Sequence, residues 1–403
     1  MFRPVRHRLA AGAAAALTAV TLAGCAGASA PASAPAPESE SAALDGGTRV
    51  AIAYDGGVLV LDGETLEPVG EADLPGYLRV STAGDADGHV FVTTDGGFHV
   101  LDTGIASGEV AFTGEVFDAA TPGHVTPHAG RTALFDDATG DVRIFDTDAI
   151  GTGELPPFDT LSSDAAHHGV AIELSDGTSL STIGTSESRS GVRHLDADGT
   201  EVARNETCPA VHGEGAVKDE AVVFGCEDGV LLFSDGAFTK LDAPDEFGRT
   251  GNAYVTDTSP IAVGDYKTDP DAEGYLLSAL TLVDTEAQTL SVVQLPEGVE
   301  YTWRGVGRDE HDGIVLLSAD GSLYSLDETG AVQDSWPVIE PWESPVEWQN
   351  PHPGLKVVGD IAYVSEPAAN SIHAVDLHSG EIIASQELDE VPGEFVVVGA
   401  VEH

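Results

Sequence analysis

The chain has 403 residues, with 17 lysine and arginine residues against 68 aspartate and glutamate residues, so its formal net charge is −51. A field of this sign repels nucleic acid and anionic lipid, which excludes proteins that bind phosphate backbones. It attracts cations in general, but scattered acidic residues also keep a protein soluble at high salt. Charge by itself therefore does not indicate a metal function.

The N-terminus, residues 1–24, is predicted to be a bacterial lipoprotein signal. Three arginines precede an apolar run over residues 9–22, which is too short to span a bilayer comfortably. The sequence LAGC at residues 22–25 resembles a lipobox, so we expect Cys25 to carry the lipid; an ordinary secretory signal with a chance cysteine is the alternative. Residues 25–48 are rich in Ala, Ser and Pro and are predicted to form a flexible tether. No later stretch is long enough for a membrane helix.

A protein anchored in this way lies in the cell envelope, outside the cytoplasmic membrane, where disulfides persist. Once Cys25 is lipidated, only Cys208 and Cys226 remain, an even pair. We therefore expect these two cysteines to be joined. Their separation suits a cross-link within one small sheet, and the bond would hold the segment that carries His212 against a neighbouring strand.

The rest of the chain repeats one pattern eight times. Each copy is a tight-turn signal followed by alternating apolar residues that end at or beside an aspartate, which is typical of a half-buried strand. The average spacing of about 45 residues leaves room for four short strands, so the expected fold is all-β, a single β-propeller. The copies are DGGVLVLD (55–62), DGGFHVLD (95–102), TGDVRIFD (139–146), SGVRHLD (190–196), DGVLLFSD (228–235), ALTLVD (279–284), DGSLYSLD (320–327) and NSIHAVD (370–376).

Eight copies predict eight blades in one domain, residues 49–403. Residues 394–402 have the pattern of an innermost strand with no blade after it. Residues 49–57 have the pattern of a second strand with no inner strand before it. We therefore expect the C-terminal strand to complete the first blade and close the ring. Seven blades are the alternative if the weakest copy, which ends at Asp235, is misassigned.

Three histidines recur with the period of the repeat. His124, His168 and His212 are spaced 44 residues apart, and the segment after each one has the pattern of a second strand. The first strand of a propeller blade lines the central channel, so we expect the three rings to converge there from adjacent blades. Zinc takes about four N, O or S ligands at roughly 2.0–2.3 Å, and three imidazoles supply most of such a site. Because the chain has 14 histidines, a hydrated cluster without metal is the alternative.

The sequence leaves the fourth ligand open. Glu214 lies two residues after His212, which puts it on the same strand face about 6–7 Å further along, unless the strand kinks at Gly213. Asp136 and Asp137 follow the inner strand of their repeat and could either reach in or accept hydrogen bonds from a ligand. The candidates are Glu214, His128, Asp137 and His352.

Other conspicuous side chains are expected to be structural. The third-strand segments carry several histidines away from the channel, and the histidine next to His168 should point in the opposite direction. Three aromatic residues near repeat starts are expected to belong to the core or the channel wall. These residues are His99, His194, His373 and His167, and Tyr77, Trp303 and Trp348.

Several stretches resemble the AztD-type zinc metallochaperones, extracytoplasmic β-propellers encoded with a zinc ABC importer. The resemblance covers most of the chain after the tether, and the pair CPxxHGE and FGCxDG is its most specific part. It implies zinc ligands at the three histidines in register and a structural bridge between the two cysteines. Many members carry a His-rich N-terminal segment, whereas the tether here has no histidine. The stretches are HVTPHAGRTALFDDATG (124–140), HHGVAIEL (167–174), CPAVHGEG (208–215), VVFGCEDGVLL (222–232) and NPHPGLKVVGD (350–360).

The resemblance implies a monomeric zinc metallochaperone, not an enzyme, that delivers zinc to the solute-binding protein of a zinc ABC importer. Histidine ligands suit transfer because they hold zinc less permanently than thiolates. One alternative is a metal-dependent propeller enzyme of the lyase or lactonase type, with His212 as base and Glu214 as its orienter. The other is a metal-free interaction propeller. The residues in register are histidines rather than the oxygen ligands that a lactonase calcium site requires.

Overall fold

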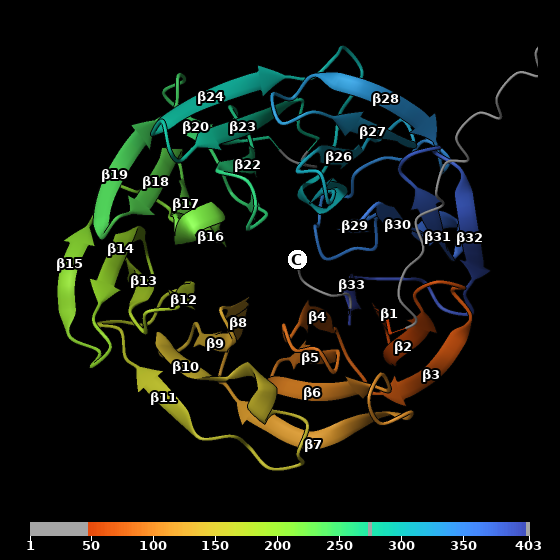
Figure 1. The fold of residues 1–403 in the computed structure, drawn as a ribbon, viewed down its shortest axis with the longest axis horizontal. Helices are drawn as coiled ribbons and strands as arrows, with labels where there is room; N and C mark the ends of the chain where they lie inside the picture. The colour runs from red at the N-terminus through yellow and green to blue at the C-terminus, as the bar shows by residue number, and fades with distance from the viewer. Residues whose placement is uncertain (1–46, 273–275, 400–403) are drawn as a thin grey trace, which may run out of the picture. The chain divides into compact units, whose positions relative to one another are not determined.

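A computed structural model describes residues 47–272 and 276–399, all within the compact unit Ser41–His403. These residues form 33 strands in eight sheets that follow one another around a ring (Figure 1). Within the same ranges the helices are four single turns of 3-10 helix, at Thr147–Ala149, Lys218–Glu220, Trp303–Gly305 and Pro367–Ala369. The prediction of an all-β propeller is confirmed.

Each blade has four strands in chain order from the centre outward, except that the first blade takes its innermost strand from the C-terminus. The innermost strands are β33 (Phe395–Val398), β4 (Arg79–Thr82), β8 (Pro122–His128), β12 (Ala171–Glu173), β16 (His212–Ala216), β21 (Ala253–Tyr254), β25 (Val306–Arg308) and β29 (Leu355–Val358). The second strands are β1 (Arg49–Tyr54), β5 (His89–Thr94), β9 (Arg131–Asp136), β13 (Ser179–Gly184), β17 (Val222–Cys226), β22 (Ile261–Asp265), β26 (Ile314–Leu317) and β30 (Ile361–Glu366).

The third and outer strands complete the blades. The third strands are β2 (Gly57–Asp62), β6 (Gly97–Thr103), β10 (Asp141–Asp146), β14 (Arg189–Leu195), β18 (Asp228–Ser234), β23 (Ala279–Asp284), β27 (Ser322–Leu326) and β31 (Ser371–Asp376). The outer strands are β3 (Pro68–Asp73), β7 (Val110–Asp118), β11 (Phe158–Leu161), β15 (Glu201–Asn205), β19 (Ala237–Asp242), β24 (Thr289–Gln294), β28 (Val332–Pro337) and β32 (Ile382–Glu387). A short extra strand, β20 (Gly248–Arg249), pairs with β18.

The ring closes as the sequence predicted. β33 pairs antiparallel with β1, with Arg49 opposite Val398 and Ile52 opposite Phe395. The core lies between the faces of neighbouring blades: one buried cluster joins β1 of the first blade to β30 and β31 of the eighth. A second cluster joins the first blade to β4 and β5 of the second. Residues of β33 belong to both clusters, so burial of apolar surface stabilises the C-terminal strand within the ring.

The repeated aspartates have a physical role in most blades, because they cap the turn that leads to the outer strand. Oδ1 of Asp62, for example, accepts hydrogen bonds from the backbone N–H groups of Glu64 and Thr65 at 3.1 and 3.0 Å. The weakest copy is different. Asp235 and Gly236 form a two-residue hairpin between β18 and β19, with φ of 52° and 75°. This copy is a genuine blade, so the number of blades is eight and not seven.

The proposed lipidation residue Cys25, the signal (1–24) and the tether up to residue 46 lie outside the described residues. In the ranges that the structure does describe, no helix is long and apolar enough to cross a membrane.

Candidate metal centre

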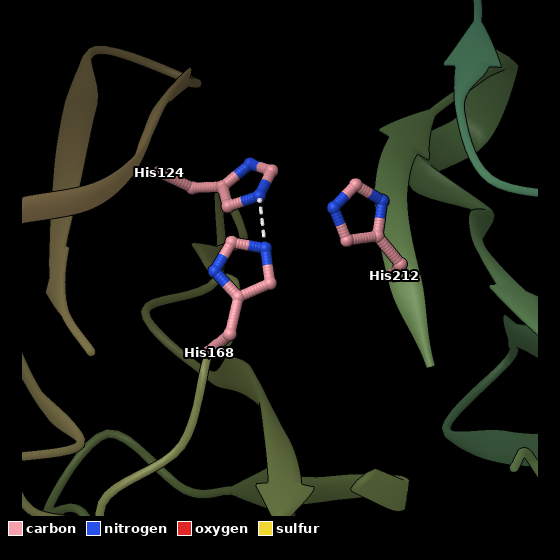
Figure 2. Close-up of side chains that lie close together, drawn as sticks. All are labelled: His124, His168 and His212. Carbon is pink, nitrogen blue, oxygen red and sulfur yellow. Dashed lines mark hydrogen bonds between the residues drawn. The ribbon is translucent and has the colours of Figure 1, made fainter. Parts of the chain in front are cut away.

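The three histidines in register come together at the inner edge of three consecutive blades, with their rings turned toward one another (Figure 2). His124 lies within β8, His212 begins β16, and His168 precedes β12 by three residues. One ring nitrogen from each residue lies within 4.8 Å of the other two. The equal spacing along the chain therefore corresponds to equivalent positions on neighbouring blades.

The rings form a nearly equilateral triangle. The centroid of the His124 ring lies 5.0 Å from that of His168 and 5.1 Å from that of His212, and the remaining pair is 5.1 Å apart. The Nε2 atoms of His124 and His168 are separated by 3.3 Å. Two nitrogen ligands at about 2.05 Å from one tetrahedral zinc would lie about 3.3 Å apart. The donor set and its spacing thus fit a zinc-sized ion.

Two of the rings are oriented through Nδ1. Nδ1 of His168 lies 2.6 Å from Oδ2 of Asp137, and Nδ1 of His212 lies 2.6 Å from the backbone oxygen of Gly251. A carbonyl oxygen can only accept, so Nδ1 of His212 carries the hydrogen and donates it. The same tautomer lets His168 donate to the carboxylate. Nε2 of each ring then keeps its lone pair for a metal, the usual arrangement around metal-bound histidine.

Burial keeps two of the rings neutral. It lowers the pKa of His124 well below the ordinary value, and positive charge on His212 or His168 would lower it further. Burial also lowers the pKa of His212 to about 3, although the hydrogen bond to the oxygen of Gly251 opposes this. Because only neutral imidazole binds a metal, these two ligands need not lose a proton at neutral pH. His168 is exposed whereas the other two histidines are half-buried.

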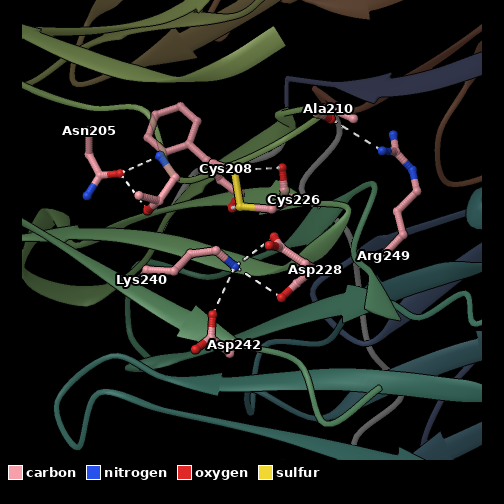
Figure 3. The surroundings of a disulfide bond; sticks show 11 residues. Asn205, Cys208, Ala210, Cys226, Asp228, Lys240, Asp242 and Arg249 are labelled. Atoms are coloured by element: carbon pink, nitrogen blue, oxygen red, sulfur yellow. Dashed lines mark hydrogen bonds and ion pairs between the residues drawn. A yellow bond between two sulfur atoms is a disulfide. The ribbon is translucent and has the colours of Figure 1, made fainter. Parts of the chain in front are cut away.

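A disulfide fixes the chain just before β16. It joins Cys208 to Cys226, the last residue of β17, with their Cα atoms 5.0 Å apart and both residues buried (Figure 3). Between them in sequence, the N–H of Ala210 donates to the backbone oxygen of Arg189, and its carbonyl accepts from Nη1 of Arg249 at 3.3 Å. The approach to the third histidine is therefore held by a cross-link and by hydrogen bonds to two other segments.

None of the four candidates for a fourth ligand belongs to the group formed by the three histidines. The strand does kink at Gly213, where φ is 60° and the pairing register shifts between His212 and Glu214. The Glu214 carboxylate instead accepts a hydrogen bond from Oγ1 of Thr126 at 2.8 Å, and burial raises its pKa. This bond connects β16 to β8 across the intervening blade.

The other candidates have different partners. Nε2 of His128 lies 2.8 Å from Oε1 of Glu220. Nδ1 of His352 donates to the backbone oxygen of Asn350 at 2.8 Å, and burial lowers its pKa to about 4. Asp137 accepts a hydrogen bond from His168, which is the second of the two roles that the sequence suggested for it. Its neighbour Asp136 accepts from the backbone N–H groups of residues 120 and 121.

The histidines predicted to be structural lie away from the cluster. His167 is buried and contacts Oγ1 of Thr182 at 3.1 Å, opposite in direction to its neighbour. Two of the third-strand histidines pack or pair within their blades, His99 against Phe112 and His373 beside Glu366. His194 packs against Phe233 on β18 of the next blade.

A cavity of about 420 Å³ lies beside the histidines. The histidine register continues around its wall: Arg79 is 45 residues before His124, and later inner positions of the ring also face the cavity. The two tryptophans expected in the core or channel wall are among them. The sequence analysis did not place basic residues in this wall, although the spacing of the repeat could have indicated Arg79. Besides the histidines, the wall includes Arg79, Arg189, Arg249, Asn252, Trp303 and Trp348.

A second group of metal-ligating side chains, Glu310, His311 and Asp360, also has donor atoms within 4.8 Å of one another. Two of the three are exposed, and His378 contacts Asp360 at 2.7 Å. This group was not predicted from the sequence.

Fold and site together define an eight-bladed β-propeller with a candidate metal centre at its inner edge. No family model matches the chain. The chain is similar to the zinc chaperone AztD of Citrobacter koseri, with 24% identity over 291 residues. The match covers 69% of this chain and 66% of that protein, slightly less than two thirds of its length.

Solved structures agree on the fold. The structure of apo AztD from Citrobacter koseri matches with a TM-score of 0.75 and 21% identity, over 88% of this chain and 99% of that chain. A crystal structure of Citrobacter koseri AztD matches with a TM-score of 0.73 and 20% identity, over 88% and 98%. The dihydro-heme d1 dehydrogenase NirN in complex with DHE has a TM-score of 0.60 at 13% identity, over 88% and 76%. The chain therefore has a β-propeller fold similar to that of AztD.

Proposed function

We propose that the protein is an extracytoplasmic zinc chaperone that binds zinc through His124, His168 and His212. The observation that supports this best is the triangle of histidine rings, in which two Nε2 atoms have the 3.3 Å separation of ligands on one zinc ion. The similar protein from Citrobacter koseri is named a zinc chaperone. We extend that activity to this chain.

The site is suited to holding zinc and to releasing it. Asp137 and the backbone of Gly251 set two of the rings before any metal arrives, so little ordering is required on binding. Three protein ligands leave one tetrahedral position for water or for a ligand from another protein. A partner that approaches His168, the exposed ligand, could then take the ion stepwise.

The proposed recipient is the solute-binding protein of a zinc ABC importer. In this proposal the chain is a monomer in the cell envelope, attached to the membrane by lipid on Cys25 after removal of residues 1–24. Residues 25–48 are the tether and residues 49–403 the propeller. The net charge of −51 disfavours binding to nucleic acid or anionic lipid.

The proposal assigns a carrier role and not catalysis. An enzyme of the lyase or lactonase type would use Glu214 to orient His212, but that carboxylate is hydrogen-bonded to Thr126, and Gly251 orients the ring. If the protein is a carrier, its zinc-loaded form should hydrolyse lactones and esters no faster than free zinc does.

Transfer is the direct experiment. Zinc-loaded protein is mixed with the metal-free solute-binding protein of the importer from the same cell, the two are separated, and zinc in each is quantified. We expect zinc to move to the recipient faster than it moves to a chelator of equal affinity, because contact accelerates transfer. Equal rates would mean release into solution and would contradict the chaperone function.

A further inference from the structure

The cavity beside the metal centre concentrates positive charge in a very acidic protein. Four of the 17 lysine and arginine residues line it, in a chain that has 68 acidic residues. Like charges raise the free energy of a bound cation, and the effect is strong where water is partly excluded. A cavity shaped only to attract zinc would have the opposite sign. The four residues are Arg79, Arg189, Arg249 and Lys267.

Two of these charges lack an acidic partner. In the part of the chain that the structure describes, no carboxylate forms an ion pair within 4.0 Å of the Arg189 or Arg249 guanidinium group. The acids whose charge reaches them are already engaged. Asp137 accepts from its histidine at 2.6 Å, and Asp265 accepts three hydrogen bonds from residues 251–252. Asp265 lines the cavity itself, so the wall carries four basic side chains and one carboxylate, an excess of positive charge.

The two guanidinium groups also act on each other and on the ligands. Burial lowers the pKa of Arg189, and the charge of Arg249 lowers it further. Both arginines line the same cavity as the three histidines. Their field therefore reaches the position where zinc would bind. Two fixed positive charges in the wall of one cavity favour an anion there.

The remaining wall indicates an organic anion. Trp303 and Trp348 supply aromatic surface, and Leu277 supplies an aliphatic one. Arg79 is held to one side, because its Nε contacts Glu394 at 3.2 Å and its guanidinium lies over the Trp348 ring. A volume of about 420 Å³ is within the range of small-ligand pockets.

We propose that this cavity binds a small organic carboxylate between Arg189 and Arg249, and that the bound anion raises the affinity of the adjacent centre for zinc. Guanidinium groups bind carboxylates through paired hydrogen bonds, which explains the residue type. The anion neutralises the positive wall, so zinc and carboxylate bind cooperatively and departure of one weakens the other. The cooperative half rests on the proposed zinc function; carboxylate binding does not.

Benzoate is the first probe, because it is a weak zinc ligand with an aromatic ring that suits the tryptophans. It is titrated into the metal-free full chain and followed by calorimetry and tryptophan fluorescence. We expect saturable binding that is at least about tenfold weaker in Arg189→Gln/Arg249→Gln, since both charged hydrogen bonds to the carboxylate are lost. Arg143→Gln is the matched control. Arg143, on β10, lies over the ring of Phe158 and is not among the residues that line the cavity. Equal affinity in wild type and double variant overturns the site.

Two further experiments test the chemical class of the ligand. A double Arg→Lys variant keeps both charges but loses the paired geometry, so intermediate affinity is expected and shows binding by a folded cavity. Inorganic phosphate and an acidic hexapeptide are titrated in parallel. Tighter binding of phosphate, or of the peptide, than of benzoate overturns the assignment to a small organic carboxylate.

Zinc affinity is then measured against a competing chelator with and without saturating benzoate. We expect several-fold tighter zinc binding with benzoate in wild type and no change in the arginine double variant. Zinc binding that benzoate leaves unchanged overturns the cooperativity and leaves the chaperone proposal intact. Benzoate binding without any zinc binding refutes the chaperone proposal and supports the anion site.

Discussion

Replacing Asp137 with alanine removes the carboxylate that orients His168, the exposed histidine of the proposed metal centre. Oδ2 of Asp137 accepts from Nδ1 of His168 at 2.6 Å, and Oδ1 accepts from the backbone N–H of Gly169 at 3.3 Å. Without these contacts the His168 ring can rotate and can carry its proton on Nε2, the atom that faces the other rings. Both changes weaken zinc binding without removing a ligand.

The expected loss follows from the bond that disappears. A hydrogen bond to a charged group contributes about 1.5–3 kcal/mol, and loss of an oriented partner of a metal-bound histidine typically costs about 10–100-fold in affinity. The His168 side chain is 41% exposed, so solvent screens part of this interaction. We therefore expect the dissociation constant for zinc to rise about tenfold, at the lower end of that range.

Competition with a fluorescent zinc chelator measures the change. Asp136→Ala is the matched control, because Asp136 is adjacent in sequence but, among the described residues, its carboxylate accepts hydrogen bonds from the backbone N–H groups of Ala120, Thr121 and Ala138 and from no histidine. It should lower the melting temperature and leave zinc affinity within about twofold of wild type. Equal zinc affinity in Asp137→Ala and wild type, with both folded, would refute the role of this carboxylate.

Two predictions concern stability. Cys208→Ser/Cys226→Ser opens a loop of 18 residues and should lower the free energy of unfolding by about 3 kcal/mol in denaturant titrations; a loss below about 0.5 kcal/mol would show that the bridge is dispensable. Burial lowers the pKa of His89, but the hydrogen bond and charge of Asp85 outweigh it, so the pKa is raised overall. The pair therefore stabilises the fold fully below about pH 6.5 and progressively less as pH rises through the raised value. Urea unfolding should show this decline in wild type but not in His89→Gln, and identical pH profiles would contradict it.

The fold could be predicted from the sequence because each blade of a propeller repeats the same pattern of apolar residues and turns. Each third strand carries the same alternation and most end in a turn-capping aspartate, such as Asp62, so the period could be measured without any structure. The closing strand was predictable because residues 394–402 have strand character and no blade after them. The copy ending at Asp235 was ambiguous because its turn uses a hairpin with positive φ in place of an aspartate cap.

The candidate site could be predicted in part. Equal spacing placed His124, His168 and His212 on equivalent positions, and the structure brings them together. Spacing does not give hydrogen-bond partners, so the bond between Glu214 and Thr126 could not be foreseen, although the sequence allowed for the kink at Gly213.

The positive wall was missed for a different reason. Net charge averages over the whole chain, whereas the cavity collects Arg189 and Arg249 from separate blades. The sequence of a third strand such as β14 gives no sign that its first residue, Arg189, lines the cavity.

Metal content of the purified chain tests the central claim most directly. Wild type, His168→Ala and His167→Gln are loaded with zinc, freed of excess metal, and quantified by mass spectrometry. His167 is the matched control because it is adjacent in sequence but buried against Thr182, away from the cluster. We predict that His168→Ala holds about one zinc fewer per chain than wild type and that His167→Gln matches wild type. Equal zinc content in His168→Ala and wild type would contradict a metal centre at the three histidines.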